Sequence, residues 1–225
     1  MLNLVKKENI PKTCVYRYIR KFGLQSYVQH PPQNKIILNH DFFENIDNEH
    51  KAYWLGMLVA DGNISDFGRK SYTIRLLLKN SDIYHVEQFA KDIGIDKKVH
   101  INNDGRGSIA IHSKKMFFDL MSHGVMPQKT RHEVFPELPK ELVPHFIRGF
   151  FDGDGTIYKR NETNPKRKRP QCCIGFVCGN KKFIDALNAV LRDECGVVMH
   201  PSYRPNKDVW EMKTEARMDC KHNLS

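Results

Sequence analysis

The 225-residue sequence lacks a long hydrophobic stretch, and this excludes one class of protein. Its longest apolar runs reach about nine residues, whereas a helix that crosses a bilayer needs about 20. The opening MLNLVKKENI is too polar to contain the core of a secretory signal. We therefore expect a cytoplasmic protein of a bacterial, phage or organellar system, which is not secreted and has no membrane partner.

Two further features are scarce: paired cysteines and acidic residues. The six cysteines form no C-x-x-C pairs and show no histidine spacing typical of zinc sites, so reduced thiols are expected. The 26 Asp+Glu residues are outnumbered by 36 Lys+Arg, which gives a formal net charge of +10. A charge balance of this kind favours a polyanionic partner, nucleic acid before membrane.

Two stretches of the chain resemble each other. WLGMLVADG (54–62) and IRGFFDGDG (147–155) each read as a buried helix that ends in Asp-Gly, and their acids lie 93 residues apart (154 − 61 = 93). A hairpin, an amphipathic helix and further strands follow both stretches in the same order. We predict an α+β fold of two αββαββα halves related by a pseudo-twofold axis. In this prediction the second copy is truncated at its C-terminus, where its last helix is missing.

The sequence divides into four predicted segments. Residues 1–25 resemble part of a helix-turn-helix, with Arg17 and Arg20 on the exposed face of its second helix. A linker is expected over 26–44, the first half over 45–135 and the second half over 136–225.

The two repeated helices carry both small residues and acids. Gly56 and Ala60 lie four residues apart on one helix, as Gly149 and Gly153 do on the other, and this spacing lets two helix backbones approach closely. Asp61 and Asp154 then fall at the negative ends of both helices, where each carboxylate costs roughly 0.3–1 kcal/mol. A cation between the acids would offset that cost, and Mg²⁺ suits such hard oxygen ligands. In a basic protein, this arrangement predicts phosphodiester cleavage.

Residues 54–62 and 147–155 resemble the two LAGLIDADG motifs of single-chain homing endonucleases, and the likeness extends over about residues 45 to 225. The resemblance implies that Asp61 and Asp154 bind metal and that each cuts one DNA strand, leaving 3′ overhangs. It also implies an antiparallel β-saddle on DNA, Mg²⁺ as cofactor with Mn²⁺ able to substitute, and Lys129 as a further catalytic residue. Asp152, which stands where the first motif has Val59, is expected to be structural or solvent-facing.

The expected partner is double-stranded DNA with a long, nearly asymmetric target site, bound by a monomer. Strand alternation and loop positions give the candidate DNA-binding residues, where Arg and Gln can read bases and Lys can hold phosphates. Besides Arg17 and Arg20, they are Arg69, Lys70, Thr73, Arg75, Lys159, Arg160, Lys166, Arg167, Lys168, Arg169, Gln171, Tyr203, Arg204 and Lys207.

A second interpretation stays open: a DNA- or RNA-binding protein of the same fold, acting as a group I intron maturase or a regulator with weak or no cleavage. Intron RNA would then be a partner. The presence of both acids favours the endonuclease, whereas the short C-terminus leaves room for the binding protein.

Overall fold

The computed structural model describes residues 17, 21, 38–68, 71–95, 99–127, 132–160 and 171–217, without the side chains of 159, 160, 171 and 215–217. The chain divides into two compact units, Met1–Ile36 and Ile37–Ser225. The helix-turn-helix-like segment predicted over 1–25 lies outside the described residues, except for Arg17 and Lys21, which are helical and exposed. None of the helices that the structure describes is long and apolar enough to cross a membrane.

The second unit contains the same order of elements twice, which confirms the predicted duplicated fold. The first copy consists of α3 (Glu49–Ala60), β1 (Gly62–Asp66), β2 (Tyr72–Leu78), a 3₁₀ turn (Asn80–Asp82), α4 (Ile83–Asp92), β3 (His100–Ile101), β4 (Gly107–His112) and α5 (Lys114–Ser122). The second copy consists of α6 (Val143–Asp154), β5 (Gly155–Arg160), β6 (Gln171–Cys178), α7 (Lys181–Cys195), β7 (Ser202–Arg204) and β8 (Val209–Arg217). Each copy forms one antiparallel sheet, in the orders β1-β2-β4-β3 and β5-β6-β8-β7.

Local capping explains where several helices start and stop. The side chains of Asn48, Ser113 and Asn180 each accept a hydrogen bond from a backbone N–H in the first turn of α3, α5 and α7. At the other end of α7, Gly196 adopts a left-handed conformation with φ of 65°. This conformation favours glycine and ends the helix.

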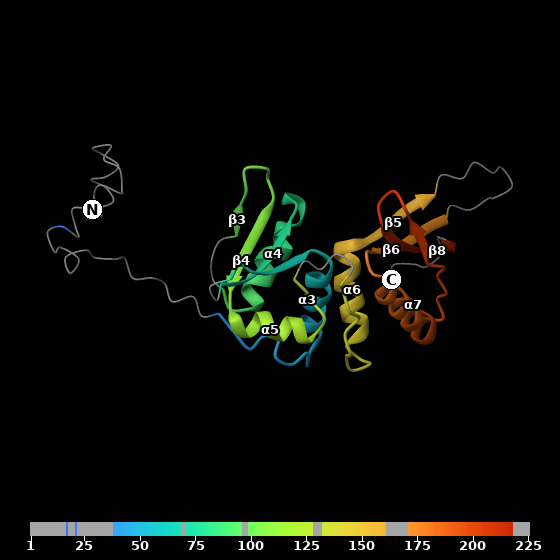
Figure 1. Ribbon diagram of the computed structural model, residues 1–225. Helices are drawn as coiled ribbons and strands as arrows, with labels where there is room; N and C mark the ends of the chain where they lie inside the picture. Colours follow the sequence, from blue (N-terminus) through green and yellow to red (C-terminus); the bar gives the residue numbers. More distant parts are fainter. Residues whose placement is uncertain are drawn as a thin grey trace, which may run out of the picture. The chain divides into compact units, whose positions relative to one another are not determined.

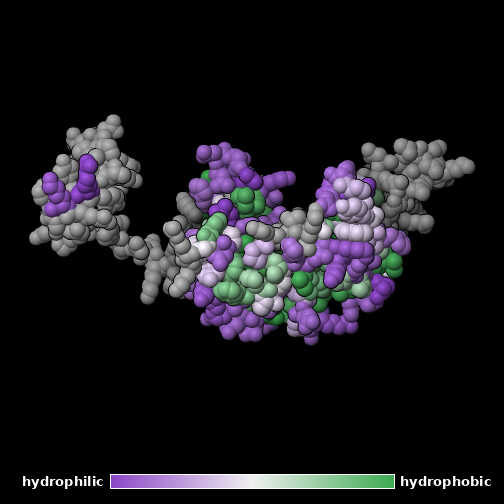
Figure 2. Space-filling view, in the orientation of Figure 1, coloured by the Kyte–Doolittle hydropathy of each residue, from purple (hydrophilic) through white to green (hydrophobic). Residues whose placement is uncertain are grey.

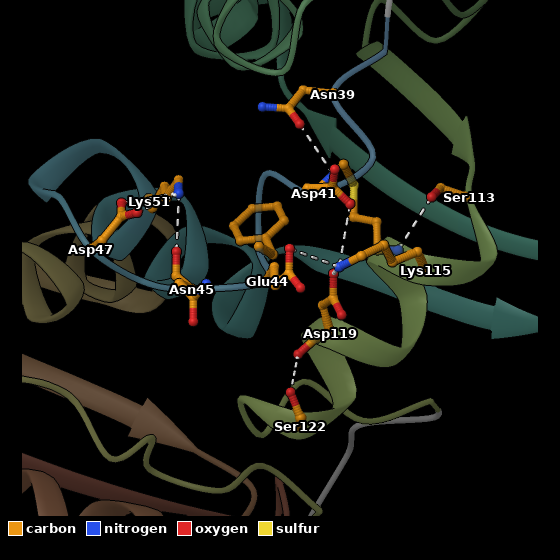
Figure 3. Close-up of polar contacts among 12 residues, drawn as sticks. Asn39, Asp41, Glu44, Asn45, Asp47, Lys51, Ser113, Lys115, Asp119 and Ser122 are labelled. Atoms are coloured by element: carbon orange, nitrogen blue, oxygen red, sulfur yellow. Dashed lines mark hydrogen bonds and ion pairs between the residues drawn. The ribbon is translucent and has the colours of Figure 1, made fainter.

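The first half begins earlier than the linker predicted over 26–44 allows. Phe42 and Phe43 are buried in the core, with 6% and 0% of their surface exposed. The Lys115 ammonium of α5 lies 3.4 Å from Asp41 and 3.3 Å from Glu44, which ties the same segment to the first half (Figure 3). The prediction was wrong for residues 38–44, because their burial depends on tertiary contacts that the local sequence does not show.

The two halves are not covered equally on their helix-facing sides. Ile64 pairs with Ile74 in the first sheet, and Ile157 pairs with Ile174 in the second. Ile64 is 1% exposed, whereas Ile157 is 63% exposed. In the first half, α5 packs on β2. The second half therefore leaves apolar sheet surface uncovered by the described residues.

The helices α3 and α6 lie side by side between the two sheets (Figure 1), and theirs is the most extensive contact between any two elements. A Cβ on Gly56 would clash with the carbonyl oxygen of Phe146 and lie 2.7 Å from the backbone nitrogen of Phe150. On the other helix, a Cβ on Gly149 would clash with the carbonyl oxygen of Tyr53. The two helix backbones are therefore in direct contact at these glycines, as the small-residue spacing predicts.

The helix interface leads to a stability prediction for Gly56→Ala. The added methyl group would clash with backbone atoms, which cannot change rotamer as a side chain can. We therefore expect the free energy of unfolding to fall by an amount at or above the upper end of about 1–3 kcal/mol. Gly196→Ala is the control, because its Cβ meets nothing within 4 Å. It carries only the cost of its left-handed backbone, about 1–2 kcal/mol. Urea unfolding measures both, and a smaller loss for Gly56→Ala than for Gly196→Ala would contradict the close contact.

Candidate active site at the motif helices

The motif helices run parallel and bring their acidic ends together. Gly56 packs against Phe146 and Phe150, and one turn later Gly153 packs against Ala60 and Asp61. Because the contacting residues advance toward the C-terminus along both helices, the helices are parallel and the C-terminal ends of α3 and α6 are neighbours. A Cβ on Gly153 would lie 3.1 Å from Oδ2 of Asp61, so the carboxylate of the first motif lies against the backbone of the second.

Both predicted catalytic acids are exposed at these ends. Asp61 is the C-cap residue of α3, and Asp154 is the last residue of α6. The negative end of each helix dipole disfavours its carboxylate by roughly 0.3–1 kcal/mol, so a bound cation would be stabilised at this position. No cluster of three or more ligating side chains occurs among the described residues. Two carboxylates fit Mg²⁺, which keeps several waters and shares its remaining positions with phosphate oxygens.

A cavity of about 670 Å³ opens beside Asp61. Asp152 and Gly153 of the second motif line one part of it, and Lys79 and His85 of the first half line another. The cavity thus combines charged groups of both signs from both halves next to Asp61.

Asp152 is held by the other half of the molecule. Its Oδ2 accepts a 2.9 Å hydrogen bond from the hydroxyl of Tyr53, and the Arg148 guanidinium lies 5.0 Å from the centre of the Tyr53 ring. Burial, together with the hydrogen bond to Asp152, raises the pKa of the Tyr53 hydroxyl well above its usual value. Tyr53 therefore remains a donor, and Asp152 has a structural contact across the helix interface.

The surroundings of Asp154 differ from those of Asp61. Nearby, Cys178 is a buried thiol whose pKa is raised to about 12, mainly by burial, with smaller contributions from the charges of Glu133 and Asp154. Glu133 is itself 8% exposed, and its Oε2 has no hydrogen-bond partner among the described residues. The connector between the halves thus places the carboxylate of Glu133 near Cys178. The sequence of this connector, RHEVFPELP, contains no motif that predicts the position of Glu133.

Residues 141–217 match the LAGLIDADG-like domain family. In fold, the chain is similar to I-LtrWI, a LAGLIDADG homing endonuclease bound to target DNA (TM-score 0.50, 10% identity, 79% of this chain and 80% of that one). It is also similar to I-SmaMI bound to an uncleaved DNA target in the presence of calcium ions (TM-score 0.52, 11% identity, 75% and 79%). These likenesses confirm the fold inferred from the two motifs.

A curated relative shows where a similar sequence occurs in a longer protein. The DNA-directed RNA polymerase subunit Rpo1C of Methanocaldococcus jannaschii is 27% identical over 163 residues, which make up 70% of this chain. The chain spans 16% of the length of that protein.

The outer face of the first sheet carries some of the predicted DNA-binding residues. Arg75 is exposed there, as expected. Thr73 differs from the expectation, because it is 4% exposed and its hydroxyl lies 3.1 Å from Nδ1 of His112 on β4. Strand alternation predicts which way a side chain points but not which neighbour covers it. In the face shown in Figure 2, hydrophilic residues cover the β3–β4 hairpin.

In the second sheet, three candidates lie at the β7–β8 turn. Tyr203 and Arg204 are exposed on β7, where Arg204 forms an ion pair with Glu211, and Lys207 is exposed in the turn. The backbones of Lys159, Arg160 and Gln171 belong to β5 and β6, but their side chains are not described. The remaining candidates lie outside the described residues: Arg20, Arg69, Lys70, Lys129, Lys166, Arg167, Lys168 and Arg169.

The raised pKa of Cys178 predicts its reactivity. At pH 8 almost all of this thiol is protonated, and the thiolate is the reactive species, so a disulfide reagent should modify Cys178 at least about 100-fold more slowly than the exposed Cys195. The thiolate fraction rises only as the pH approaches 12. Peptide mass spectrometry after timed labelling compares the two sites, with unfolded protein as the reference in which both react. Equal labelling of the folded protein would contradict the buried environment near Asp154.

Proposed function

We propose that the protein is a site-specific homing endonuclease that cuts both strands of double-stranded DNA with a divalent metal and leaves 3′ overhangs. One observation carries this proposal: two parallel LAGLIDADG helices end in exposed carboxylates, Asp61 and Asp154, at neighbouring positions. With two acids at one helix interface, each acid can serve the cleavage of one DNA strand. I-LtrWI and I-SmaMI, whose structures contain target DNA, share this fold.

The metal is proposed to be Mg²⁺, with Mn²⁺ able to replace it. When bound, such a cation activates water and stabilises the leaving oxygen of a phosphodiester. Asp61 and Asp154 would hold it, because they supply exposed carboxylate oxygens at the negative helix ends. The Lys129 side chain is proposed to stabilise charge at the scissile phosphate.

The proposed partner is a long, nearly asymmetric DNA site bound by a monomer. The two sheets differ in the residues that they present, with Arg75 on the first and Arg204 and Lys207 on the second, so a symmetric sequence would not fit both equally. The net charge of +10 favours the DNA backbone.

The test uses DNA made by joining the sequences that flank this gene in its genome. Wild-type protein with Mg²⁺ should cut both strands, and chelation should stop the reaction until Mg²⁺ is restored. Asp61→Asn and Asp154→Asn should each lower the cutting of one strand by at least about 100-fold, since each removes a proposed metal ligand, and leave nicked DNA. The two variants should spare opposite strands.

Asp193→Asn is the matched control, because Asp193 is an exposed acid of α7 paired with Arg192. It should cut as the wild type does. Unchanged double-strand cutting by either motif variant would refute the proposed sites. DNA that is bound but left intact by the wild type would favour the maturase or regulator interpretation.

A further inference from the structure

The cavity beside Asp61 holds a group that the proposed metal site does not use. His85, in the first turns of α4, lines this cavity together with Asp61, Lys79, Arg106, Asp152 and Gly153. A polar space of about 670 Å³ is large enough for several water molecules, which need such polar partners. His85 and Asp61 therefore border the same volume of solvent.

Two side chains, those of Tyr53 and Asp152, fix the orientation of the His85 ring. The Tyr53 hydroxyl donates its one proton to Oδ2 of Asp152 at 2.9 Å, and its oxygen lies 3.4 Å from Nδ1 of His85. Since that proton is already committed, the Tyr53 oxygen can only accept from the histidine. The proton of a neutral His85 therefore lies on Nδ1, which leaves Nε2 with a lone pair that can take a proton.

We propose that His85 is the general base of the Asp61 site, with Tyr53 and Asp152 as its positioning residues. This rests on the endonuclease function proposed above. A water molecule in the cavity gives a proton to Nε2 of His85, and its oxygen forms a bond to the scissile phosphorus. The bond from phosphorus to the leaving sugar oxygen breaks, and that oxygen takes a proton from solvent, to which His85 later returns its own.

The Asp154 site has no counterpart of His85, Tyr53 or Asp152 at the equivalent positions. At the 93-residue offset, Phe146 stands in place of Tyr53 and Val59 in place of Asp152 (53 + 93 = 146; 152 − 93 = 59). The corresponding turn of α7 carries Asp185, whose carboxylate is exposed and paired with Lys181, and α7 contains no histidine. The two cleavage sites are therefore chemically unequal, and the strand assigned to Asp61 should be cut first.

Strand-resolved kinetics on DNA labelled differently at its two 5′ ends tests the proposal. The strand that Asp61→Asn fails to cut identifies the Asp61 strand. His85→Ala should slow this strand by about 100-fold or more, the usual contribution of a general base, and leave the other strand at the wild-type rate. Added imidazole should restore part of the lost rate, which it would not do for a merely structural residue.

Tyr53→Phe places in the first half the residue that the second half already has, and it should slow the same strand by about 10- to 100-fold. Asp185→Asn is the control and should change neither strand. If the wild type leaves bound DNA intact, the endonuclease function itself fails. If the wild type cuts but His85→Ala slows both strands alike, slows neither or gains nothing from imidazole, the role of His85 is wrong while the endonuclease stands.

Discussion

The structure depends on the direct contact of two helix backbones at Gly56 and Gly149. Glycine at these positions lets α3 and α6 approach so closely that a single methyl group would meet a main-chain carbonyl. The apolar residues on their other faces, such as Trp54 and Phe150, are then free to fill the core of each half. The same contact fixes the register of the helices, so that Gly153 lies against Asp61 and the two motif acids, Asp61 and Asp154, are neighbours.

This arrangement places two carboxylates where their electrostatic free energy is unfavourable, and a bound cation would lower that energy. Two carboxylates lie at negative helix ends, where a cation is favoured and an anion is not. In the proposed complex, DNA would bring phosphates to the same place, and a divalent cation between carboxylate and phosphate oxygens would balance both. The halves nevertheless surround their acids differently. A polar cavity with His85 adjoins Asp61, whereas the charge of Asp154 acts on the buried thiol of Cys178.

Much of this could be predicted from the sequence, because the motif signal is local and occurs twice. The glycine spacing and the Asp-Gly ends lie within single helices, and the order of strands repeats along the chain. Burial of Phe43 could not be predicted, since its ring meets Phe89, far along the chain. The contact of Tyr53 with Asp152 joins residues 99 positions apart and depends on the helix register. The role of residues 1–25 stays a prediction.

The central claim is that the paired helix ends form a metal site on DNA. The most direct measurement is anomalous diffraction from crystals of the protein with Mn²⁺ and the joined flanking DNA. The account predicts anomalous peaks bounded by the carboxylates of Asp61 and Asp154 and by phosphate oxygens. A DNA complex without a peak between the two helix ends, or with Mn²⁺ bound elsewhere on the protein, would contradict it.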